Sequence, residues 1–139
     1  MLVEGVEKIT IVSPFGWRTR AGNNEFHQGV DIRVVDEKWR TLRILAPEKL
    51  KITAINMDPM WGHWIKAVPL EANELGIDEF RFWHQVPLIN CVEGAIFFQD
   101  DPMCIPEAGF VALHLHFATL KNIGEFVDPM PYLKLRELV

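Results

Sequence analysis

The sequence predicts a mainly β protein. Its apolar residues occur in short runs separated by Gly, Pro, Asn and Asp, and helical periodicity is scarce until the last dozen residues. β-Branched and aromatic residues are frequent in these runs and suit a half-buried pleated surface. A chain of 139 residues with 49% hydrophobic and 24% charged residues is typical of one domain with a buried core. We therefore expect residues 1–139 to form a single domain.

Each predicted strand is bounded by residues that favour turns. The strands are expected at Lys8–Val12, Gly29–Val34, Arg43–Ala46, Leu50–Asn56, Trp64–Val68, Phe80–Gln85, Ala95–Phe98 and Ala112–Ala118. The turns are expected at Pro14–Gly16, Ala21–Asn24, Met57–Pro59, Asp100–Pro102 and Glu107–Gly109. Glu71–Gly76 is either a helical turn or part of a long hairpin loop.

One short helix is expected at the C-terminal end. Asp128-Pro129-Met130-Pro131 precedes Tyr132–Leu138, and proline is tolerated in the first turn of a helix because the nitrogens there have no intrahelical acceptor. The sequence thus predicts a β-rich domain that closes with a short helix.

Charge and cysteine content exclude several classes of protein. A formal charge of −5 and a pI near 5.5 offer no basic surface for nucleic acid or anionic membrane. Arg18 and Arg20 form the densest positive stretch, which is expected to be a solvated loop. Cys91 and Cys104 are too few for a disulfide framework or a four-cysteine zinc site, so buried thiols are expected, with one disulfide between them left open.

Neither end of the chain indicates export or membrane insertion. Met1–Lys8 lacks the cationic start and apolar core of a secretory signal, and no apolar run approaches the length that spans a bilayer. We therefore expect no membrane insertion. The chain either leaves the cytoplasm by another route or has lost an upstream signal.

The histidines carry most of the functional information. In Leu113–Phe117 polar and apolar residues alternate, so a strand places His114 and His116 on one face, about 6.5–7 Å apart along the strand. One imidazole can then bind a metal while its neighbour stands over a bound substrate. His27 and Asp31 share a face if the strand near Gly29 includes both, because their separation is even. His84 is a third candidate base.

Two histidines and one carboxylate suit Zn²⁺ with an open fourth position for water, as in catalytic zinc sites. The same ligand set suits ferrous iron in oxygenases, which is the competing chemistry. The additional histidines, His84 and His114, have a purpose in hydrolysis and none that an oxygenase requires. From spacing alone, His114 and His116 are equivalent candidates for the ligand.

Other polar and aromatic residues receive simpler interpretations. His63 is expected to be a surface histidine, and Arg18 is expected to make a structural hydrogen bond in preference to meeting a substrate carboxylate. Trp61, Trp64 and Trp83 are expected in the core, with the edge of a groove as the alternative.

Several motifs together resemble the lysostaphin-type, or LytM-type, zinc endopeptidases of peptidoglycan. The most specific are Ser13–Arg18 (Ser-Pro-Phe-Gly-Trp-Arg), Phe26–Ile32 (Phe-His-Gln-Gly-Val-Asp-Ile) and Leu113–Phe117 (Leu-His-Leu-His-Phe). Weaker matches are Arg43–Ile52 with Ala46-Pro47, Met60–Ile65, Phe82–His84 and Val127–Leu133. The resemblance extends from about residue 13 to the C-terminus.

The resemblance implies an antiparallel β-sheet sandwich with a groove, of the LytM (duplicated hybrid motif) type, with one Zn²⁺ per chain. It implies that His27, Asp31 and His116 are the zinc ligands and that His84 and His114 are the catalytic histidines. It implies hydrolysis of peptide bonds in peptidoglycan cross-links or stem peptides, at the cell wall, in the periplasm or outside the cell. A viral lysis enzyme, a viral tail-associated enzyme or one domain of a larger autolysin would each fit this description.

Two features keep alternatives open. Some domains of this family have lost ligands and serve as binding or activating modules for other wall hydrolases, although all five site positions are present here. The approach to the His-x-His motif, Gln99–Phe110, and the tryptophan at Trp83 depart from the family pattern. These departures affect the groove walls, so the bond that is cut stays open.

Overall fold

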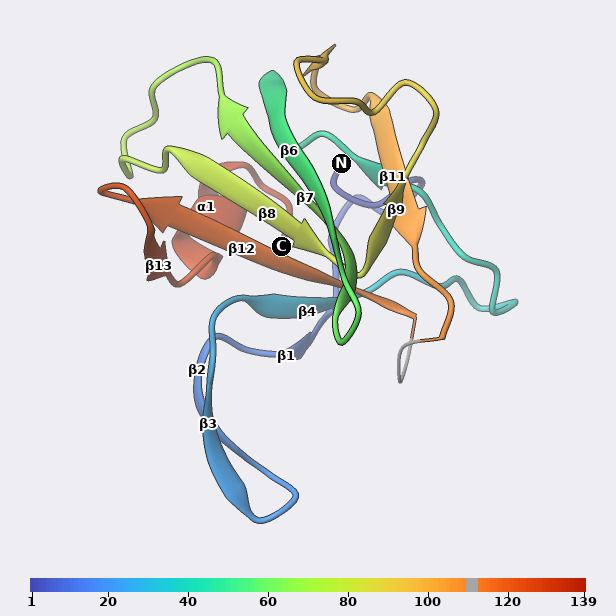
Figure 1. Ribbon diagram of the computed structural model, residues 1–139, viewed down its shortest axis with the longest axis vertical. Helices are drawn as coiled ribbons and strands as arrows, with labels where there is room; N and C mark the ends of the chain where they lie inside the picture. Colours follow the sequence, from blue (N-terminus) through green and yellow to red (C-terminus); the bar gives the residue numbers. More distant parts are fainter. Residues whose placement is uncertain (110–112) are drawn as a thin grey trace.

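Antiparallel pairing organises the strands of this protein, whose computed structural model describes residues 1–109 and 113–139 (Figure 1). The largest sheet has eight strands in the order β1-β4-β12-β8-β7-β6-β10, and β13 also pairs with β12. Its strands are β1 (Ile11–Ser13), β4 (Val30–Arg33), β12 (His114–Lys121), β8 (Glu79–Trp83), β7 (Gly62–Pro69), β6 (Leu50–Asp58), β10 (Ile96–Phe97) and β13 (Glu125–Val127).

Two smaller sheets and one helix complete the described fold. The first smaller sheet consists of β5 (Ile44–Leu45), β11 (Pro102–Pro106) and β9 (Gln85–Pro87). The second is the hairpin of β2 (Gly16–Arg20) and β3 (Asn23–His27), which projects away from the other strands as an arm (Figure 1). The helix is α1 (Met130–Leu135). The predicted mainly β, antiparallel fold with a short C-terminal helix is confirmed.

Most predicted strands coincide with observed ones, with shifted ends. The segment Lys8–Val12 is a strand only from Ile11, and Phe80–Gln85 is interrupted at His84, whose φ is +61°. Ala112, the first residue of the last predicted strand, lies outside the described residues, and β12 starts at His114. The region Glu71–Gly76 contains bends and a turn but no helix.

The helix begins earlier than the sequence predicted. It starts at Met130, since Pro129 is the N-cap and Pro131 lies in the first turn. It ends before Glu137, which has a φ of +56°, so the predicted end at Leu138 was wrong.

The arm was the main element that the sequence did not predict. Its turn is only Ala21-Gly22, with φ of 50° and 79°, so Asn23 and Asn24 belong to β3 and not to the predicted turn. A two-residue loop with both φ positive matches the right-handed twist of a hairpin. The strands β2 and β3 are polar and do not enter the core, so they lack the apolar signal by which the other strands were recognised.

The main sheet has one core face and one polar face. Phe80, Phe82 and Phe117 point into the core, where α1 packs against them through Tyr132, with ring centroids 5.1 Å from Phe80 and 6.2 Å from Phe117. The Tyr132 hydroxyl donates to the buried Glu48 carboxylate at 2.6 Å. Trp83 of β8 and His114 and His116 of β12 face the other side and are half-buried. Strand alternation therefore assigns the histidines of β12 to the face opposite the helix.

Cys91 and Cys104 are buried free thiols, as predicted, and burial raises the pKa of Cys91 to about 11. Among the described residues, no helix is both long enough and apolar enough to cross a membrane.

Candidate metal centre

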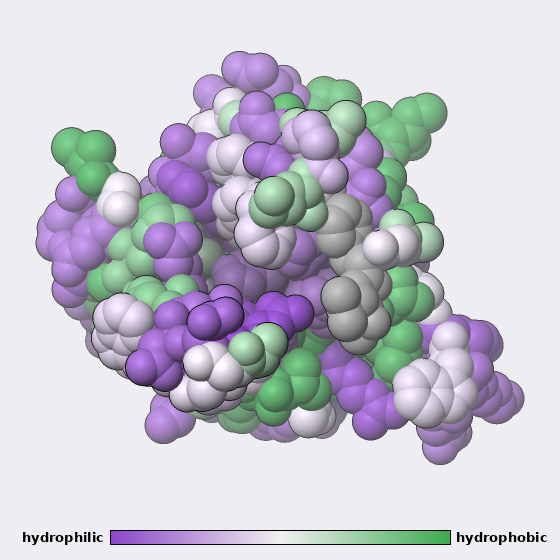
Figure 2. Space-filling model, turned by 60° about the horizontal axis from the view of Figure 1, so that its bottom comes forward, coloured by the Kyte–Doolittle hydropathy of each residue, from purple (hydrophilic) through white to green (hydrophobic). Residues whose placement is uncertain are grey.

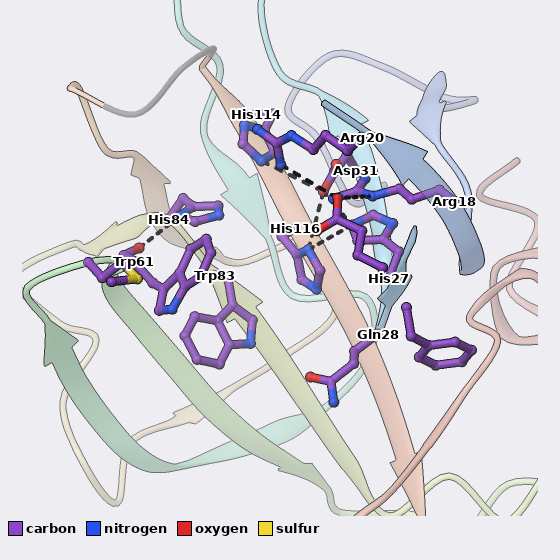
Figure 3. A pocket seen from close by; sticks show the side chains of 13 residues that line it. Arg18, Arg20, His27, Gln28, Asp31, Trp61, Trp83, His84, His114 and His116 are labelled. Atoms are coloured by element: carbon purple, nitrogen blue, oxygen red, sulfur yellow. Dashed lines mark hydrogen bonds and ion pairs between the residues drawn. The ribbon is translucent and has the colours of Figure 1, made fainter. Parts of the chain in front are cut away.

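Three strands bring His27, Asp31 and His116 together. In the β4–β12 register Asp31 lies opposite His116, and His27 is the last residue of β3. The His27 Nε2 atom lies 3.1 Å from His116 Nδ1 and 3.2 Å from Asp31 Oδ1, and His116 Nδ1 lies 3.2 Å from the same carboxylate oxygen (Figure 3). A single strand that includes both His27 and Asp31 was the condition for a shared strand face. This condition is not met, because the chain leaves β3 at His27 and enters β4 at Val30.

The geometry of these atoms fits a small divalent cation. Ligand atoms about 2.0–2.2 Å from a tetrahedral zinc ion are separated from one another by roughly 3.3 Å. The three observed separations of 3.1–3.2 Å form a nearly regular triangle of this size. His27 is only 5% exposed, so the cluster is also largely shielded from bulk water. These three residues could therefore hold a metal ion with little rearrangement.

Neighbouring groups orient the candidate ligands. The Nδ1–H of His27 donates to the Pro14 carbonyl at 2.8 Å, which leaves the lone pair of the neutral ring on Nε2, the atom that faces the cluster. Arg18 donates to Ser13 Oγ at 2.7 Å and to Glu25 Oε1 at 2.9 Å, and its Nη1 atom lies 3.5 Å from Asp31 Oδ2. The structural hydrogen bond expected of Arg18 is present, and its guanidinium also supports the candidate ligand Asp31.

Gly29 permits the close approach of β4 to His116. A Cβ atom built at this position would lie 2.4 Å from the Phe117 carbonyl oxygen and 2.7 Å from His116 Nε2. Such distances are far below van der Waals contact, so only glycine fits here without displacing the His116 ring or the backbone of β12. This glycine is part of the motif His-Gln-Gly-Val-Asp, but the sequence alone does not reveal the close approach that requires it.

The electrostatics of the cluster favour the protonation states that bind metals. Burial raises the pKa of Asp31, but the close contacts of its carboxylate with the His116 and His27 rings outweigh this effect and hold that pKa far below its usual range. Burial lowers the pKa of His116, against the opposing effect of its hydrogen bond to Asp31. Near neutral pH the carboxylate is therefore ionised and the His116 ring is neutral, and both states have lone pairs for a cation.

His84 and His114 stand beside the cluster. The His114 Nε2 atom is 3.6 Å from Asp31 Oδ1, and the ring centroids of His84 and His114 are 4.8 Å apart. The His84 ring donates through Nδ1 to the Trp61 carbonyl at 2.7 Å, and the His84 carbonyl accepts from the Glu107 backbone at 2.8 Å. Burial lowers the pKa of His84, so its neutral form persists below the usual range of histidine.

The left-handed backbone at His84 explains how this ring leaves the strand. A φ of +61° is unfavourable for a residue other than glycine, and it persists only where the surroundings hold it. Gln85, fully buried, donates through its side chain to the carbonyls of His114 at 3.1 Å and Trp83 at 3.3 Å. The strands β8 and β12 are thereby held together where their ladder ends.

The five candidate residues line one groove of about 450 Å³. Figure 2, in which the bottom of Figure 1 comes forward, shows a hollow on this face with a mostly hydrophilic lining. Besides the five, its lining residues are Arg18, Arg20, Glu25, Phe26, Gln28, Met60, Trp61 and Trp83. Trp61 and Trp83 thus edge the groove, while Trp64 stacks on Trp83 with centroids 4.8 Å apart.

His63 lies outside the groove lining and is partly exposed, as expected for a surface histidine. It is not simply solvated, because its Nδ1 atom lies 2.7 Å from Glu107 Oε1. Glu107, Gln85 and the carbonyls of Pro14 and Trp61 are site contacts that sequence reasoning missed. Backbone carbonyls leave no mark in a sequence, so only a known fold could have revealed them.

Comparison of sequences found no match, either to a protein-family model or to a curated protein. Comparison of structures found proteins with a similar fold. The catalytic domain of the antimicrobial peptidase lysostaphin from Staphylococcus simulans aligns with a TM-score of 0.62 and 21% identity over 90% of each chain. A zinc-containing peptidase from Vibrio cholerae aligns with a TM-score of 0.66 and 17% identity over 90% of this chain. This chain spans only 39% of that peptidase.

A subunit of the SpoIIIAH–SpoIIQ complex also has a similar structure. Its TM-score is 0.72 at 14% identity, over 95% of this chain and 97% of that one. The protein therefore has the fold of lysostaphin-like peptidases, a fold that also occurs in a protein–protein complex. At these identities the likeness establishes the fold, and the chemistry has to be argued from the site.

Proposed function

We propose that this protein is a zinc-dependent endopeptidase that hydrolyses peptide bonds in peptidoglycan cross-links or stem peptides. The observation that carries the proposal is the arrangement of two histidines and one aspartate as a triangle of metal-sized edges, with two further histidines beside it in an open groove. The lysostaphin-like fold supports the same chemistry.

The proposed ligands are His27, Asp31 and His116. Zinc bound there would act as a Lewis acid that activates water and polarises the scissile carbonyl. The chain supplies the rest of the site. Arg18 orients Asp31, and the Pro14 carbonyl orients His27. The partial burial of the cluster strengthens its electrostatic interactions.

His84 and His114 are proposed to move protons and to stabilise the negative oxygen of the tetrahedral intermediate. The neutral His84 ring carries its proton on Nδ1, so its Nε2 atom has a lone pair that can accept a proton from water. The oxygen of that water adds to the carbonyl carbon, the carbon–nitrogen bond breaks, and the leaving nitrogen takes up a proton. The products are a carboxylate and an amine.

The alternative is a catalytically inactive binding or activating module for other wall hydrolases. The similarity to a subunit of the SpoIIIAH–SpoIIQ complex favours it, since that fold serves assembly there. The two functions differ in their need for metal. Equilibrium metal analysis of the purified protein is expected to give one Zn²⁺ per chain and a higher melting temperature with zinc, and a metal-free protein that zinc does not stabilise would support the module.

Two variants test the division of roles. His116→Ala is expected to lose zinc, whereas His114→Ala is expected to keep zinc and to lose cleavage of purified peptidoglycan. His63→Ala is the matched control, because His63 does not line the groove, and it should retain both. Full activity in both His114→Ala and His116→Ala would refute the assignment.

The proposed place of action is the cell wall, the periplasm or the extracellular space, with peptidoglycan as the partner and nucleic acid excluded by the acidic charge. Mass spectrometry of fragments released from purified walls of several bacterial types would identify the bond that is cut.

A further inference from the structure

The two sides of the groove differ in chemical character. The strand order places β4 on one side of β12 and β8 and β7 on the other, and the arm precedes β4. Arg18 and Arg20 of the arm therefore line one side, while Trp83 of β8 and Met60 and Trp61 of the β6–β7 turn line the other. Figure 3 shows Arg18 and Trp83 on opposite sides of the His27, Asp31 and His116 cluster.

Arg20 is the arginine that is able to meet a substrate. Arg18 is committed to Ser13 and Glu25, whereas Arg20 is 58% exposed, and its one ion pair among the described residues is a long one of 4.0 Å with Glu25. The two positive charges of Arg18 and Arg20 offset the two negative charges of Glu25 and Asp31. A bound divalent ion would therefore give the groove a net positive charge. This local charge stands out in a chain whose formal charge is −5, and it favours an anionic group on the ligand.

Stacked side chains hold the Trp83 part of the apolar side in place. Trp83 stacks on Trp64 with an interplanar angle of 13°, and the Arg81 guanidinium covers Trp64 at 5.4 Å and Phe126 at 5.1 Å. Trp83 is also the register partner of His116, so its indole borders the cluster. Across the same side, Trp61 is 49% and Met60 71% exposed. A stacked indole such as that of Trp83 can bind a small apolar group with little loss of side-chain conformational entropy.

We infer that the groove selects an alanyl–diamino-acid cross-link in which a free carboxylate lies on the carbon that bears the scissile nitrogen, in preference to a glycine bridge. The carboxylate pairs with Arg20, and the alanyl methyl group packs on Trp83 and Met60. A glycine bridge has neither a charge nor a side chain, so it offers nothing for either wall to bind. This inference rests on the proposed function and names the substrate class of the same groove.

Three probes separate the two walls. The first is a peptide dimer cross-linked between D-alanine and meso-diaminopimelate. The second is the same dimer with lysine in place of diaminopimelate, which removes only the carboxylate. The third is a glycine-only peptide. Affinities are measured by calorimetry with zinc-loaded His114→Ala, and kcat/KM with the wild type. We expect the order diaminopimelate, lysine, glycine, with about fivefold between the first two, the upper range of a partly exposed ion pair.

Variants of each wall identify the residues responsible. Arg20→Gln should abolish the difference between the diaminopimelate and lysine probes. Arg40→Gln makes the same charge change on an exposed loop outside the groove lining and should preserve the difference.

Trp83→Leu should weaken the binding of both alanyl probes about fourfold, as for the loss of one buried methylene contact. Because Trp83 borders His116, Met60→Ser tests the same wall without disturbing the indole stack. Trp39→Leu, at an exposed tryptophan outside the groove lining, is the control for Trp83→Leu.

The outcomes separate this inference from the proposed function. Equal cleavage of all three probes would overturn the inference and leave the peptidase intact. The expected order of affinities without cleavage of any probe by the wild type would support the inference and contradict the peptidase. Equal affinities, or no binding of any probe, would overturn the inference.

Discussion

At the scale of single residues, the candidate metal cluster depends on neighbours that do not belong to it. Gly29 leaves room for the His116 ring, Arg18 supports Asp31, and the Pro14 carbonyl sets the tautomer of His27. Such outer contacts typically change metal affinity by about 10–100-fold when they are removed. They can be tested separately because each acts on a different ligand.

Gly29→Ala is expected to lower zinc affinity at least about tenfold and to reduce stability by about 1–3 kcal/mol, as for other overpacked sites. The added Cβ meets both the Phe117 carbonyl and His116 Nε2, so the ring must move. Competition with a chelator measures the affinity. Gly5→Ala is the control: its φ of +75° makes alanine unfavourable, but nothing lies within 4 Å, so it should lose stability without losing zinc. Unchanged affinity in Gly29→Ala would contradict the role of this glycine.

Arg18→Gln is expected to weaken zinc binding about tenfold, because Asp31 loses its guanidinium neighbour and the arm loses its tie to Ser13. Arg18→Lys should not restore it, since one ammonium cannot reproduce the fork that reaches Ser13, Glu25 and Asp31 together. Arg20→Gln, two residues along the same strand, should bind zinc normally. The same chelator competition decides, and equal affinities for Arg18→Gln and Arg20→Gln would count against a specific role.

At the scale of elements, hydrophobic patterning predicted the strands that enter the core and missed those that do not. In β8, and over part of β6, β7 and β12, buried residues alternate with more exposed ones, so the period of two is visible in the sequence. The arm has no core face, and β11 begins and ends with proline, which hides a short strand. The position of the helix could be predicted only within a few residues, because its end depends on a positive φ at Glu137.

The attachment of α1 to the sheet is expected to depend on one buried hydrogen bond. Tyr132→Phe removes the hydroxyl that donates to Glu48, and the buried carboxylate then keeps its ion pair with Arg136, at 3.0 Å. We expect a loss of about 1–3 kcal/mol in the free energy of unfolding, measured with denaturant. Zinc affinity should not change, because Tyr132 packs on the face opposite the groove. A variant as stable as the wild type would show that the bond contributes nothing.

At the scale of the whole molecule, the candidate site joins residues 89 positions apart, and the fold decides how they meet. The sequence predicted which five residues to examine because their spacing within each motif is local. It could not predict that His27 and Asp31 come from separate strands, nor that His84 adopts a left-handed backbone. Both depend on where the chain turns between strands. The composition of the groove walls likewise depends on the positions of the arm and the β6–β7 turn.

The pH dependence of stability is a property of the whole molecule that the site largely determines. The pKa values of His84 and His116 are lowered in the folded protein, chiefly by burial, and that of Asp31 is lowered by its contacts with the His116 and His27 rings, which outweigh its burial. Each of these groups therefore binds protons more tightly in the unfolded chain. The stability that they contribute is complete above their unfolded pKa values and is lost as pH falls toward the folded ones.

For the metal-free protein we expect the melting temperature to be insensitive to these groups above the ordinary histidine value of 6.5 and to fall below it. A second fall is expected below the ordinary carboxylate value of 3.8, where the unfolded form of Asp31 takes up its proton. In His84→Gln the first fall should be smaller. Zinc should raise the melting temperature near neutral pH and lose this effect in acid, because protons compete for its ligands. A melting temperature that rises as pH falls below 6.5 would contradict the lowered pKa values of both histidines.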